Sequence, residues 1–121
     1  MDILGRASEQ VQLYLIRCDG NISGMTVFTL SPFVKPGCDY CIVDIFVLNN
    51  YRGRGIASSV CRLLFKEHPG RYCIEVAEND NVALEYWDNL IAKEGHLIER
   101  IKNKESLIVY EFEITKGLIS C

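Results

Sequence analysis

The sequence predicts an α/β (α+β) fold in which helices pack on a mixed sheet. Residues 11–30 have the pattern of a β-hairpin, and the spacing of apolar residues changes from strand-like to helix-like after residue 55. Two further strand patterns occupy residues 96–114. With the elements between them, the predicted order is three strands, a helix, a strand, a helix and two strands.

The first two strands are predicted by their residue patterns and by the turn between them. Val11–Cys18 alternates apolar and polar residues, and Ile22–Leu30 is rich in β-branched and aromatic residues. Asp19-Gly20 stands between them and is a dipeptide that favours a tight hairpin turn. Together these residues predict an antiparallel hairpin.

A loop, a third strand and a helix are predicted next. Ser31–Asp39 contains two prolines and a glycine, which favour a loop. Tyr40–Leu48 is a nearly continuous apolar segment interrupted by Asp44, and this predicts a strand. From Gly55 the apolar residues follow a helical spacing, and Pro69-Gly70 is expected to end the helix.

The rest of the chain predicts a strand, a helix and a final pair of strands. Arg71–Val76 has the pattern of a buried strand. Residues 79–81 are of helix-capping type, and the apolar positions after them predict a second helix that ends near Gly95. The last predicted strands are His96–Ile101 and Leu107–Ile114, joined by a charged turn.

Composition limits the classes of function. At 121 residues, with 49% hydrophobic and 24% charged residues, the chain is expected to fold as one domain over residues 1–121. A net charge of −3 argues against nucleic acid as the main partner, because that affinity comes largely from Lys and Arg. No apolar run is long enough to cross a membrane, and residues 1–6 lack the pattern of a secretory signal, so we expect a cytoplasmic protein without a membrane partner.

The six cysteines are expected to be reduced and mostly buried, because no signal directs the chain to an oxidising compartment. Cys18, Cys61 and Cys73 each lie within an apolar pattern. Cys38-x-x-Cys41 has the spacing of half a zinc site or of a redox pair, but no second pair follows and the two histidines are isolated. We therefore expect a loop and a strand start that hold two thiols, with no metal site.

Tyr51–Ser58, which we call the glycine turn, lies where a predicted strand passes into a helix. The free N–H groups at the start of a helix point into such a turn and suit an anion. Gly53 and Gly55 allow the backbone to come close to a ligand, and Arg52 and Arg54 add positive charge. These features favour a pyrophosphate as the ligand.

Two other phosphate-binding loops fit this turn less well. A nucleoside triphosphate loop needs Gly-Lys-Ser/Thr, whereas Gly55 is followed by Ile56-Ala57. A dinucleotide fingerprint needs Gly-x-Gly-x-x-Gly, and Ser58 stands at the position of the third glycine. The antiparallel hairpin predicted before the turn is also unlike the first strand of a wound dinucleotide-binding sheet.

Two motifs in this order suggest a known family. Arg52-Gly53-Arg54-Gly55-Ile56-Ala57 follows a strand, and Glu75-Val76 precedes residues 79–87, which contain the helix start Asp80-x-x-Ala83. The sequence here resembles the GCN5-related N-acetyltransferases (GNAT), whose phosphate motif is Gln/Arg-x-x-Gly-x-Gly/Ala and whose later helix begins Asn-x-x-Ala. The similarity extends over roughly residues 11–114, and the combination of two motifs is more specific than one glycine-rich turn.

The resemblance implies a mainly antiparallel sheet with a splayed gap between the family's fourth and fifth strands, in which the pantetheine arm of acetyl-CoA lies. It implies that the strand before the glycine turn offers backbone groups to the arm, and that the turn holds the pyrophosphate. The implied cofactor-binding residues are Ile45, Phe46, Val47, Arg52, Gly53, Arg54, Gly55, Ile56, Ala57, Ser58, Asn79, Asp80 and Trp87. The implied reaction is direct attack of an amine on the thioester, with backbone donors near Val47 polarising the carbonyl.

Glu75 and Asp44 are candidate catalytic residues, because an ammonium acceptor must lose a proton before it attacks. Glu75 interrupts an apolar strand at the position where some family members have a general base, and Asp44 interrupts the neighbouring strand in the same way. Desolvation there would raise the pKa of a carboxylate and favour base chemistry near neutral pH. The alternative is that either residue faces solvent or pairs with an arginine such as Arg71.

The sequence departs from the family pattern at several places, and three of them bear on the site. Trp87 stands where relatives often have the tyrosine that protonates the coenzyme A thiolate; indole is no acid, and Tyr86 is rotated by roughly 100° around the helix. Asp80 stands where relatives have an asparagine that contacts the pantetheine. Only about ten residues precede the hairpin, where relatives have a strand and two helices that form much of the acceptor site.

These departures leave open which acceptor the protein uses, how the acceptor site is formed and whether the protein is catalytically active. The amine acceptor is either a small molecule or a protein. Its site is either open to a large substrate or completed by a second subunit in a homodimer. The chain is predicted to be an acetyltransferase, and the alternative is a coenzyme A-binding module without catalysis. A nucleic-acid-binding domain built on Arg52, Arg54 and Arg62 is disfavoured by the net charge.

Overall fold

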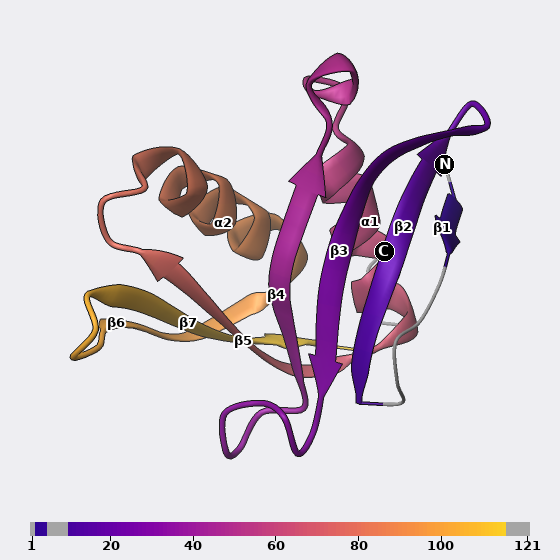
Figure 1. Cartoon of the computed structure of the whole chain (residues 1–121). Coiled ribbons are helices and arrows are strands. Elements are labelled where there is room, and N and C mark those ends of the chain that lie inside the picture. The colour runs from indigo at the N-terminus through magenta and orange to yellow at the C-terminus, as the bar shows by residue number, and fades with distance from the viewer. Residues whose placement is uncertain (1, 5–9, 116–121) are drawn as a thin grey trace, which may run out of the picture.

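The computed structural model describes residues 2–4 and 10–115 of the chain. Within this part, a seven-stranded sheet has the order β1-β2-β3-β4-β5-β7-β6, and its neighbours are antiparallel except for β4 and β5 (Figure 1). The strands are β1 (Asp2–Leu4), β2 (Val11–Cys18), β3 (Asn21–Leu30), β4 (Tyr40–Val47), β5 (Gly70–Ala77), β6 (His96–Lys102) and β7 (Leu107–Ile114). The helices are α1 (Ile56–Glu67), α2 (Asn81–Glu94) and a short 3₁₀ turn, η1 (Asn49–Tyr51).

This architecture confirms the predicted fold class and the predicted order of elements. The hairpin turn has positive φ at both Asp19 (52°) and Gly20 (81°), as a tight turn that matches strand twist requires. One strand was not predicted: β1 pairs antiparallel with β2 and extends the edge of the sheet. Met1, residues 5–9 and residues 116–121, which include Cys121, lie outside the described residues. They include half of residues 1–6, on which the absence of a secretory signal was argued.

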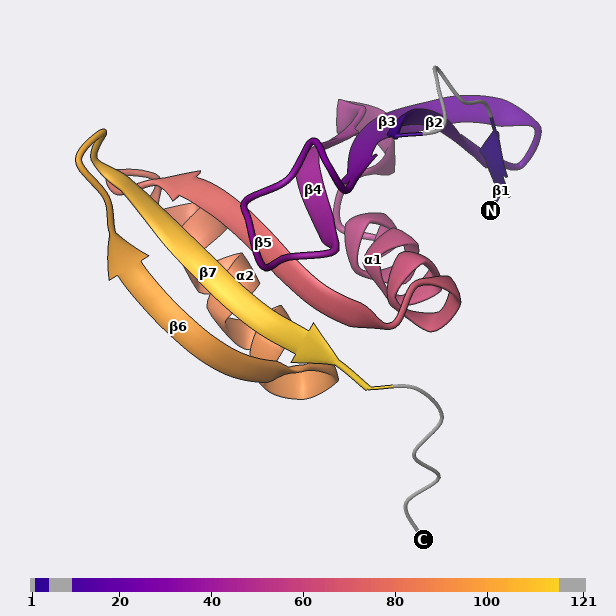
Figure 2. The same cartoon turned by 90° about the horizontal axis from the view of Figure 1, so that it is seen from below.

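The sheet divides into two halves at the junction of β4 and β5. These strands pair only at Tyr40 and Tyr72 and then diverge, so β1–β4 and β5–β7 form two wings that meet at one end (Figures 1 and 2). The gap between β4 and β5 is the splay that the family resemblance implied.

Both helices cover the same face of the wing formed by β5, β7 and β6. Tyr72 of β5 donates its hydroxyl to the His68 carbonyl oxygen at the end of α1 (2.7 Å), and Tyr110 of β7 donates to the Leu84 carbonyl oxygen of α2 (3.3 Å). Tyr72 and Tyr110 share one face because Tyr72 pairs with Phe112, two residues from Tyr110. We call the opposite side the second face of the sheet.

The core lies between the sheet and these two helices. Tyr72 stacks on Phe112, with ring centroids 5.4 Å apart, and Phe65 of α1 meets Tyr72 edge to face at 5.0 Å. The buried residues of this single cluster come from both wings and both helices, so burial of apolar surface holds the two halves together.

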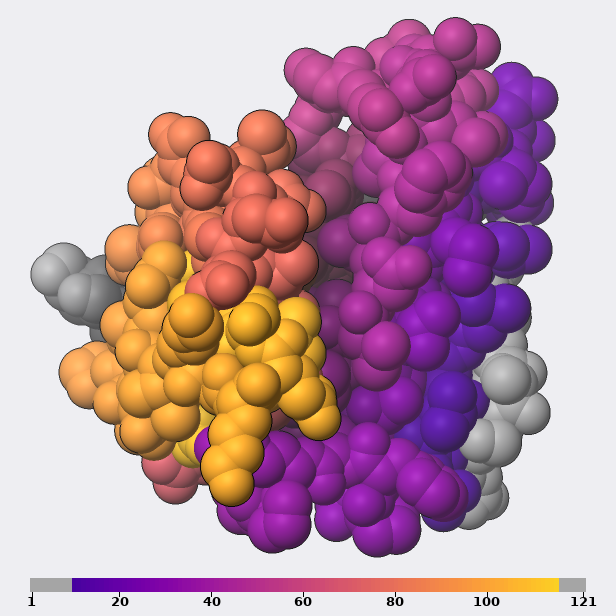
Figure 3. Space-filling model, turned by 60° about the vertical axis from the view of Figure 1, so that its left-hand side comes forward, coloured from indigo at the N-terminus to yellow at the C-terminus, as the bar shows by residue number. Residues whose placement is uncertain are grey.

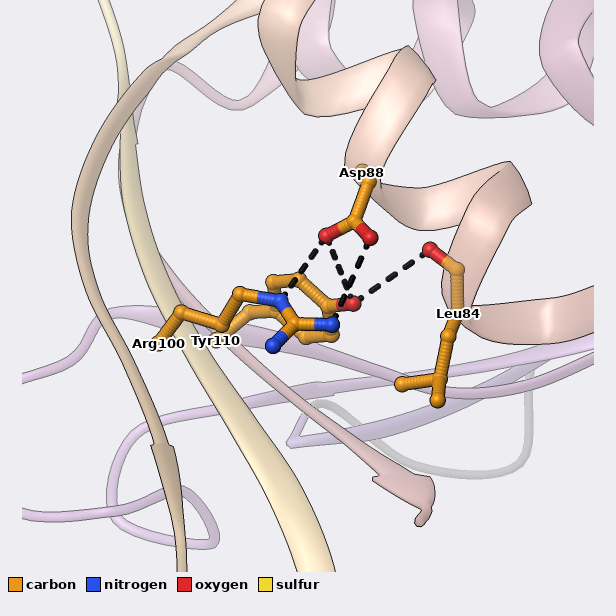
Figure 4. Close-up of polar contacts among 4 residues, drawn as sticks. All are labelled: Leu84, Asp88, Arg100 and Tyr110. Atoms are coloured by element: carbon orange, nitrogen blue, oxygen red, sulfur yellow. Dashed lines mark hydrogen bonds and ion pairs between the residues drawn. The ribbon is translucent and has the colours of Figure 1, made fainter. Parts of the chain in front are cut away.

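A polar cluster fixes α2 on its wing (Figure 4). Asp88 accepts hydrogen bonds from the Arg100 Nε atom of β6 (2.9 Å) and from the Tyr110 hydroxyl of β7 (2.9 Å). The Arg100 guanidinium also lies over the Tyr110 ring, 5.2 Å from its centroid. Tyr110 is fully buried, and its hydroxyl is satisfied by Asp88 and Leu84.

On the second face, the loop of residues 31–39 is tied to β5 and β7. Lys35 forms an ion pair with Glu111, which also approaches Arg71. Cys38 packs with Cys73 and Val109 in a small buried cluster. The loop therefore covers part of this face.

The five cysteines that the structure describes are free thiols. All of them are buried except Cys41, which is half-buried on β4, while Cys38 precedes β4 in the loop. Within residues 2–4 and 10–115, no three His, Cys, Asp or Glu side chains gather closely enough to hold a metal ion. Neither described helix has the length and apolar character needed to cross a bilayer.

Candidate functional site

The glycine turn is a backbone cradle at the start of α1. Gly53 and Gly55 have φ angles of 79° and 72°, in the left-handed region that L-residues resist. Gly55 is the N-cap and has no side chain to accept from the helix, and the first intrahelical donor is Ser59, which bonds to the Gly55 carbonyl oxygen (3.0 Å). The N–H groups of the first turn, from Ile56 to Ser58, are thus left for another acceptor.

A cavity of about 220 Å³ adjoins this cradle, and we call it the turn cavity. The added Cβ atom of an alanine at Gly53 or Gly55 would meet no other atom within 4 Å, so both glycines face open space. The lining residues are Val47, Tyr51, Arg52, Gly53, Gly55, Ile56, Ala57, Ser58 and Tyr86. Free N–H donors, space and the positive end of a helix together suit an anion.

Both arginines of the turn are held by neighbouring side chains or backbone. Arg52 donates from Nε to the Val47 carbonyl oxygen (2.9 Å), and its guanidinium lies 5.7 Å from the Phe46 ring centroid. The Arg54 guanidinium lies 5.1 Å from the Tyr51 ring centroid. These contacts keep two positive charges beside the cradle.

A larger cavity, which we call the cleft, occupies the splay between β4 and β5. Its volume is about 590 Å³, within the range typical of small-molecule sites. Figure 3 shows the hollow between the wing that contains α2 and the wing that contains β4. The lining residues are Ile42, Val43, Asp44, Ile45, Arg52, Ala57, Ile74, Glu75, Val76, Ala77, Asp80, Val82, Ala83, Tyr86 and Trp87.

The edge of β4 that faces the cleft has unpaired backbone groups. Leu48 donates its N–H to the Ser23 carbonyl oxygen of β3 (2.7 Å), and in an antiparallel ladder only alternate residues bond to a given neighbour. Phe46 therefore directs its N–H and C=O toward β3, whereas Ile45 and Val47 direct theirs toward the cleft. The bond from Arg52 to the Val47 carbonyl agrees with this direction.

A β-bulge changes which side chains of β4 face the helices. Val27 pairs with Asp44 and Phe28 with Ile42, so Val43 has no partner on β3. Because of this extra residue, Ile42 and Ile45 both pack against the core, and Asp44 lies on the second face.

The two candidate bases lie on that second face of the sheet. Glu75 stands between Ile74 and Val76, which are buried under the helices, so its side chain points the other way. Glu75 and Asp44 both line the cleft, and both are exposed. Both side chains are therefore in contact with solvent, and the described residues do not bury them.

On α2, Asp80 and Trp87 line the cleft, whereas Asn79 is exposed in the preceding turn and lines neither cavity. Asp80 is the N-cap: its Oδ1 atom accepts from the Ala83 N–H (3.1 Å). Trp87 is 7% exposed, so its indole forms part of the apolar wall.

Sequence reasoning left Tyr86 out of the site, but its side chain lines both the cleft and the turn cavity. Its hydroxyl lies 3.0 Å from the Ser58 Oγ atom of α1, and burial raises its pKa to about 12. The spacing could have found it: Ala83, Tyr86 and Trp87 stand at i, i+3 and i+4, which is one face of a helix.

The predicted difference on the acceptor side concerns the residues before β2. β1 pairs directly with β2, and residues 5–9 between them lie outside the described part of the chain.

Known protein families show where this sequence belongs. The model of the Acetyltransferase (GNAT) family matches residues 2–90. The chain belongs to this family. No curated protein matches the sequence.

Solved structures share the GNAT fold at low sequence identity. An acetyltransferase from Thermus thermophilus has a TM-score of 0.70 and 13% identity, with 89% of this chain and 67% of that chain covered. A GNAT acetyltransferase from Elizabethkingia anophelis, solved with acetyl-CoA bound, has a TM-score of 0.60 and 15% identity, with 87% and 77% covered. An N-acetyltransferase from Staphylococcus aureus has a TM-score of 0.62 and 16% identity, with 94% and 75% covered.

Proposed function

We propose that this GNAT protein transfers an acetyl group from acetyl-CoA to an amine by direct attack, as a single N-acetyltransferase domain. The observation that supports this best is that the unpaired edge of β4 leads directly into the glycine turn. One elongated ligand can therefore bind backbone groups of both the edge and the turn. Coenzyme A has the matching parts, an amide-containing arm and a pyrophosphate.

The residues present fit this cofactor. The pyrophosphate would accept from N–H groups between Gly53 and Ser58, with Arg52 and Arg54 nearby. The pantetheine amides would pair with Ile45 and Val47 as an added strand would. Since Arg52 occupies the Val47 carbonyl in the free protein, its side chain would turn away when the arm binds.

Other residues that line the cleft would shape this site. Asp80 and Trp87 form part of its wall, beside the bound arm. When bound, the cofactor supplies an activated acetyl group as its thioester. A backbone N–H near Val47 would polarise the acetyl carbonyl.

The acceptor would reach the thioester from the second face, where Glu75 and Asp44 lie. Either carboxylate could take the proton that an ammonium must lose, directly or through water. Binding of coenzyme A and acceptor would exclude water from these exposed carboxylates and so make each a stronger proton acceptor, which favours base chemistry near pH 7. The acceptor site on the second face would be open enough for a protein or a small amine. In a homodimer, the second subunit would complete this site.

The test is release of free thiol from acetyl-CoA in the presence of a panel of small amines and peptides. Thiol release that depends on an amine, and that falls at least tenfold in Glu75→Gln or Asp44→Asn, supports the proposal. Binding of coenzyme A without release of thiol for any acceptor would favour the alternative, a coenzyme A-binding module. Trp87 is the observation in favour of that alternative, since indole cannot protonate a leaving thiolate.

A further inference from the structure

The hydroxyl groups of Tyr86 and Ser58 meet at the boundary between the turn cavity and the cleft. Their oxygen atoms are 3.0 Å apart. Ser58 belongs to the first turn of α1 and Tyr86 to α2, so this hydrogen bond joins the two helices. Tyr86, Arg52 and Ala57 line both cavities, so a ligand that extends from the glycine turn into the cleft passes between or beside these three residues.

This pair has a hydrogen-bond donor to spare. The Tyr86 hydroxyl also makes a hydrogen bond with the buried Cys61 thiol, so three groups with three protons are joined by two hydrogen bonds. Burial raises the pKa of Tyr86 to about 12, so the phenol keeps its proton at neutral pH. When the Cys61 thiol donates to Tyr86 and Tyr86 donates to Ser58, the Ser58 O–H is available to an acceptor that enters the boundary between the cavities.

The Tyr86 ring is also held in place. Trp87 meets it edge to face, with ring centroids 5.3 Å apart, and Trp87 is itself buried in the core. A donor on a side chain that packing already orients loses little entropy when it binds a ligand.

We propose that Tyr86 and Ser58 together bind the pantetheine arm of coenzyme A where the arm leaves the pyrophosphate. The free hydroxyl proton of the pair donates to an oxygen of the arm, and the hydrogen bond between the two side chains orients it. This inference rests on the proposed function, because the ligand is the same. It assigns Trp87 a positioning role, as the residue that orients the Tyr86 ring.

Calorimetric titration with two ligands tests this proposal. Coenzyme A contains the arm, whereas adenosine 3′,5′-bisphosphate lacks it. Tyr86→Phe should weaken binding of coenzyme A about three- to tenfold, as loss of one hydrogen bond does, and leave binding of the bisphosphate unchanged. Ser58→Ala should show the same selectivity, and the double variant should lose less than the product of the two single losses.

Tyr110→Phe is the matched control. It also removes a hydroxyl that contacts α2, but Tyr110 lines neither cavity. This variant should be less stable than the wild type and should bind coenzyme A with unchanged affinity.

Three results would overturn the proposal while leaving the proposed function standing. Unchanged affinity in Tyr86→Phe with reduced stability would show that the hydroxyl pair only joins the helices. Equal losses of affinity for coenzyme A and for the bisphosphate in Tyr86→Phe would show that the hydroxyl does not contact the pantetheine arm. Reduced turnover with unchanged affinity would make Tyr86 a proton donor in place of a binding residue. Failure of the wild-type protein to bind coenzyme A would refute the proposed function itself.

Discussion

At the scale of single residues, two glycines make the site possible for different reasons. Gly24 of β3 lies against β4, and an added Cβ atom there would overlap the Phe46 carbonyl oxygen. Gly55 has open space around it but a φ of 72°. Gly24 therefore permits close pairing of two strands, whereas Gly55 permits a backbone conformation that presents N–H groups to a ligand.

Gly55→Leu should abolish binding of coenzyme A while the fold survives. The substituted residue would resist the left-handed conformation at a cost of roughly 1–2 kcal/mol, and its side chain would project into the turn cavity. Calorimetric titration should show affinity reduced more than tenfold.

Gly37→Leu is a close control for this change. Gly37 has a φ of 91° and open space, but it lies in the loop of residues 31–39, away from both cavities. Its stability should fall by a similar amount, and its affinity for coenzyme A should not change. Unchanged affinity in Gly55→Leu would contradict the assignment of the glycine turn.

At the scale of elements, each helix is fixed to the sheet by identifiable side chains. The end of α1 packs through His68 against Phe28 and Tyr40, with ring centroids 5.0 Å and 5.3 Å away. The middle of α2 is fixed through Asp88 to β6 and β7. Both contacts set where the helices stand relative to the cleft.

Stability should fall as pH decreases through the range in which His68 titrates. Burial lowers the pKa of His68 from its ordinary value of 6.5, so the unfolded chain takes up the proton before the folded chain does. The stability that depends on neutral His68 is complete above about pH 6.5 and is lost as pH falls below it. Urea unfolding at pH 7 and pH 5 measures this loss, and His68→Phe should show a smaller loss; an identical loss would exclude His68 as its source.

Asp88→Ala should lower the free energy of unfolding by about 1–2 kcal/mol. The change removes an acceptor from the buried Tyr110 hydroxyl and from Arg100. Chemical denaturation measures this change in the free energy of unfolding. Glu85→Ala, which removes an exposed carboxylate from the same helix, should change stability by less than about 0.5 kcal/mol. Equal effects of the two substitutions would argue against the cluster in Figure 4 as an anchor.

At the scale of the whole molecule, one splayed sheet joins two wings that share a core. The pair Tyr40 and Tyr72 closes one end of the cleft, and the glycine turn and α2 border the other. A ligand in the cleft would supply the strand pairing that β4 lacks there, so binding and stability should be coupled.

Coenzyme A at about 100 times its Kd should raise the free energy of unfolding by about 2.7 kcal/mol. Hydrogen exchange locates the effect. The amides of Ile45 and Val47 should exchange quickly in the free protein and slowly with ligand, because they face the cleft. The amide of Phe46, which already faces β3, should be protected in both states. Equal protection of Ile45 and Phe46 in the free protein would contradict the unpaired edge.

Much of the fold was predictable because it depends on local chemistry. The hairpin, both helices and the order of the strands follow from alternation, helical spacing and capping residues, and the structure confirms them. The family follows from the glycine turn and the motif at the start of α2. Strand β1 was missed because its three residues, Asp2–Leu4, are too few to show a period.

The sequence alone determined the cradle, the type of ligand it suits, both α-helices and every strand except β1, because backbone conformation and helix ends depend on neighbouring residues. Only the tertiary structure decided which side chains meet. The bulge at Val43 places Asp44 on the second face, and the path of α2 brings Tyr86 to Ser58. A bulge depends on pairing with another strand, and a contact between helices depends on how both pack, so neither can be deduced from one segment.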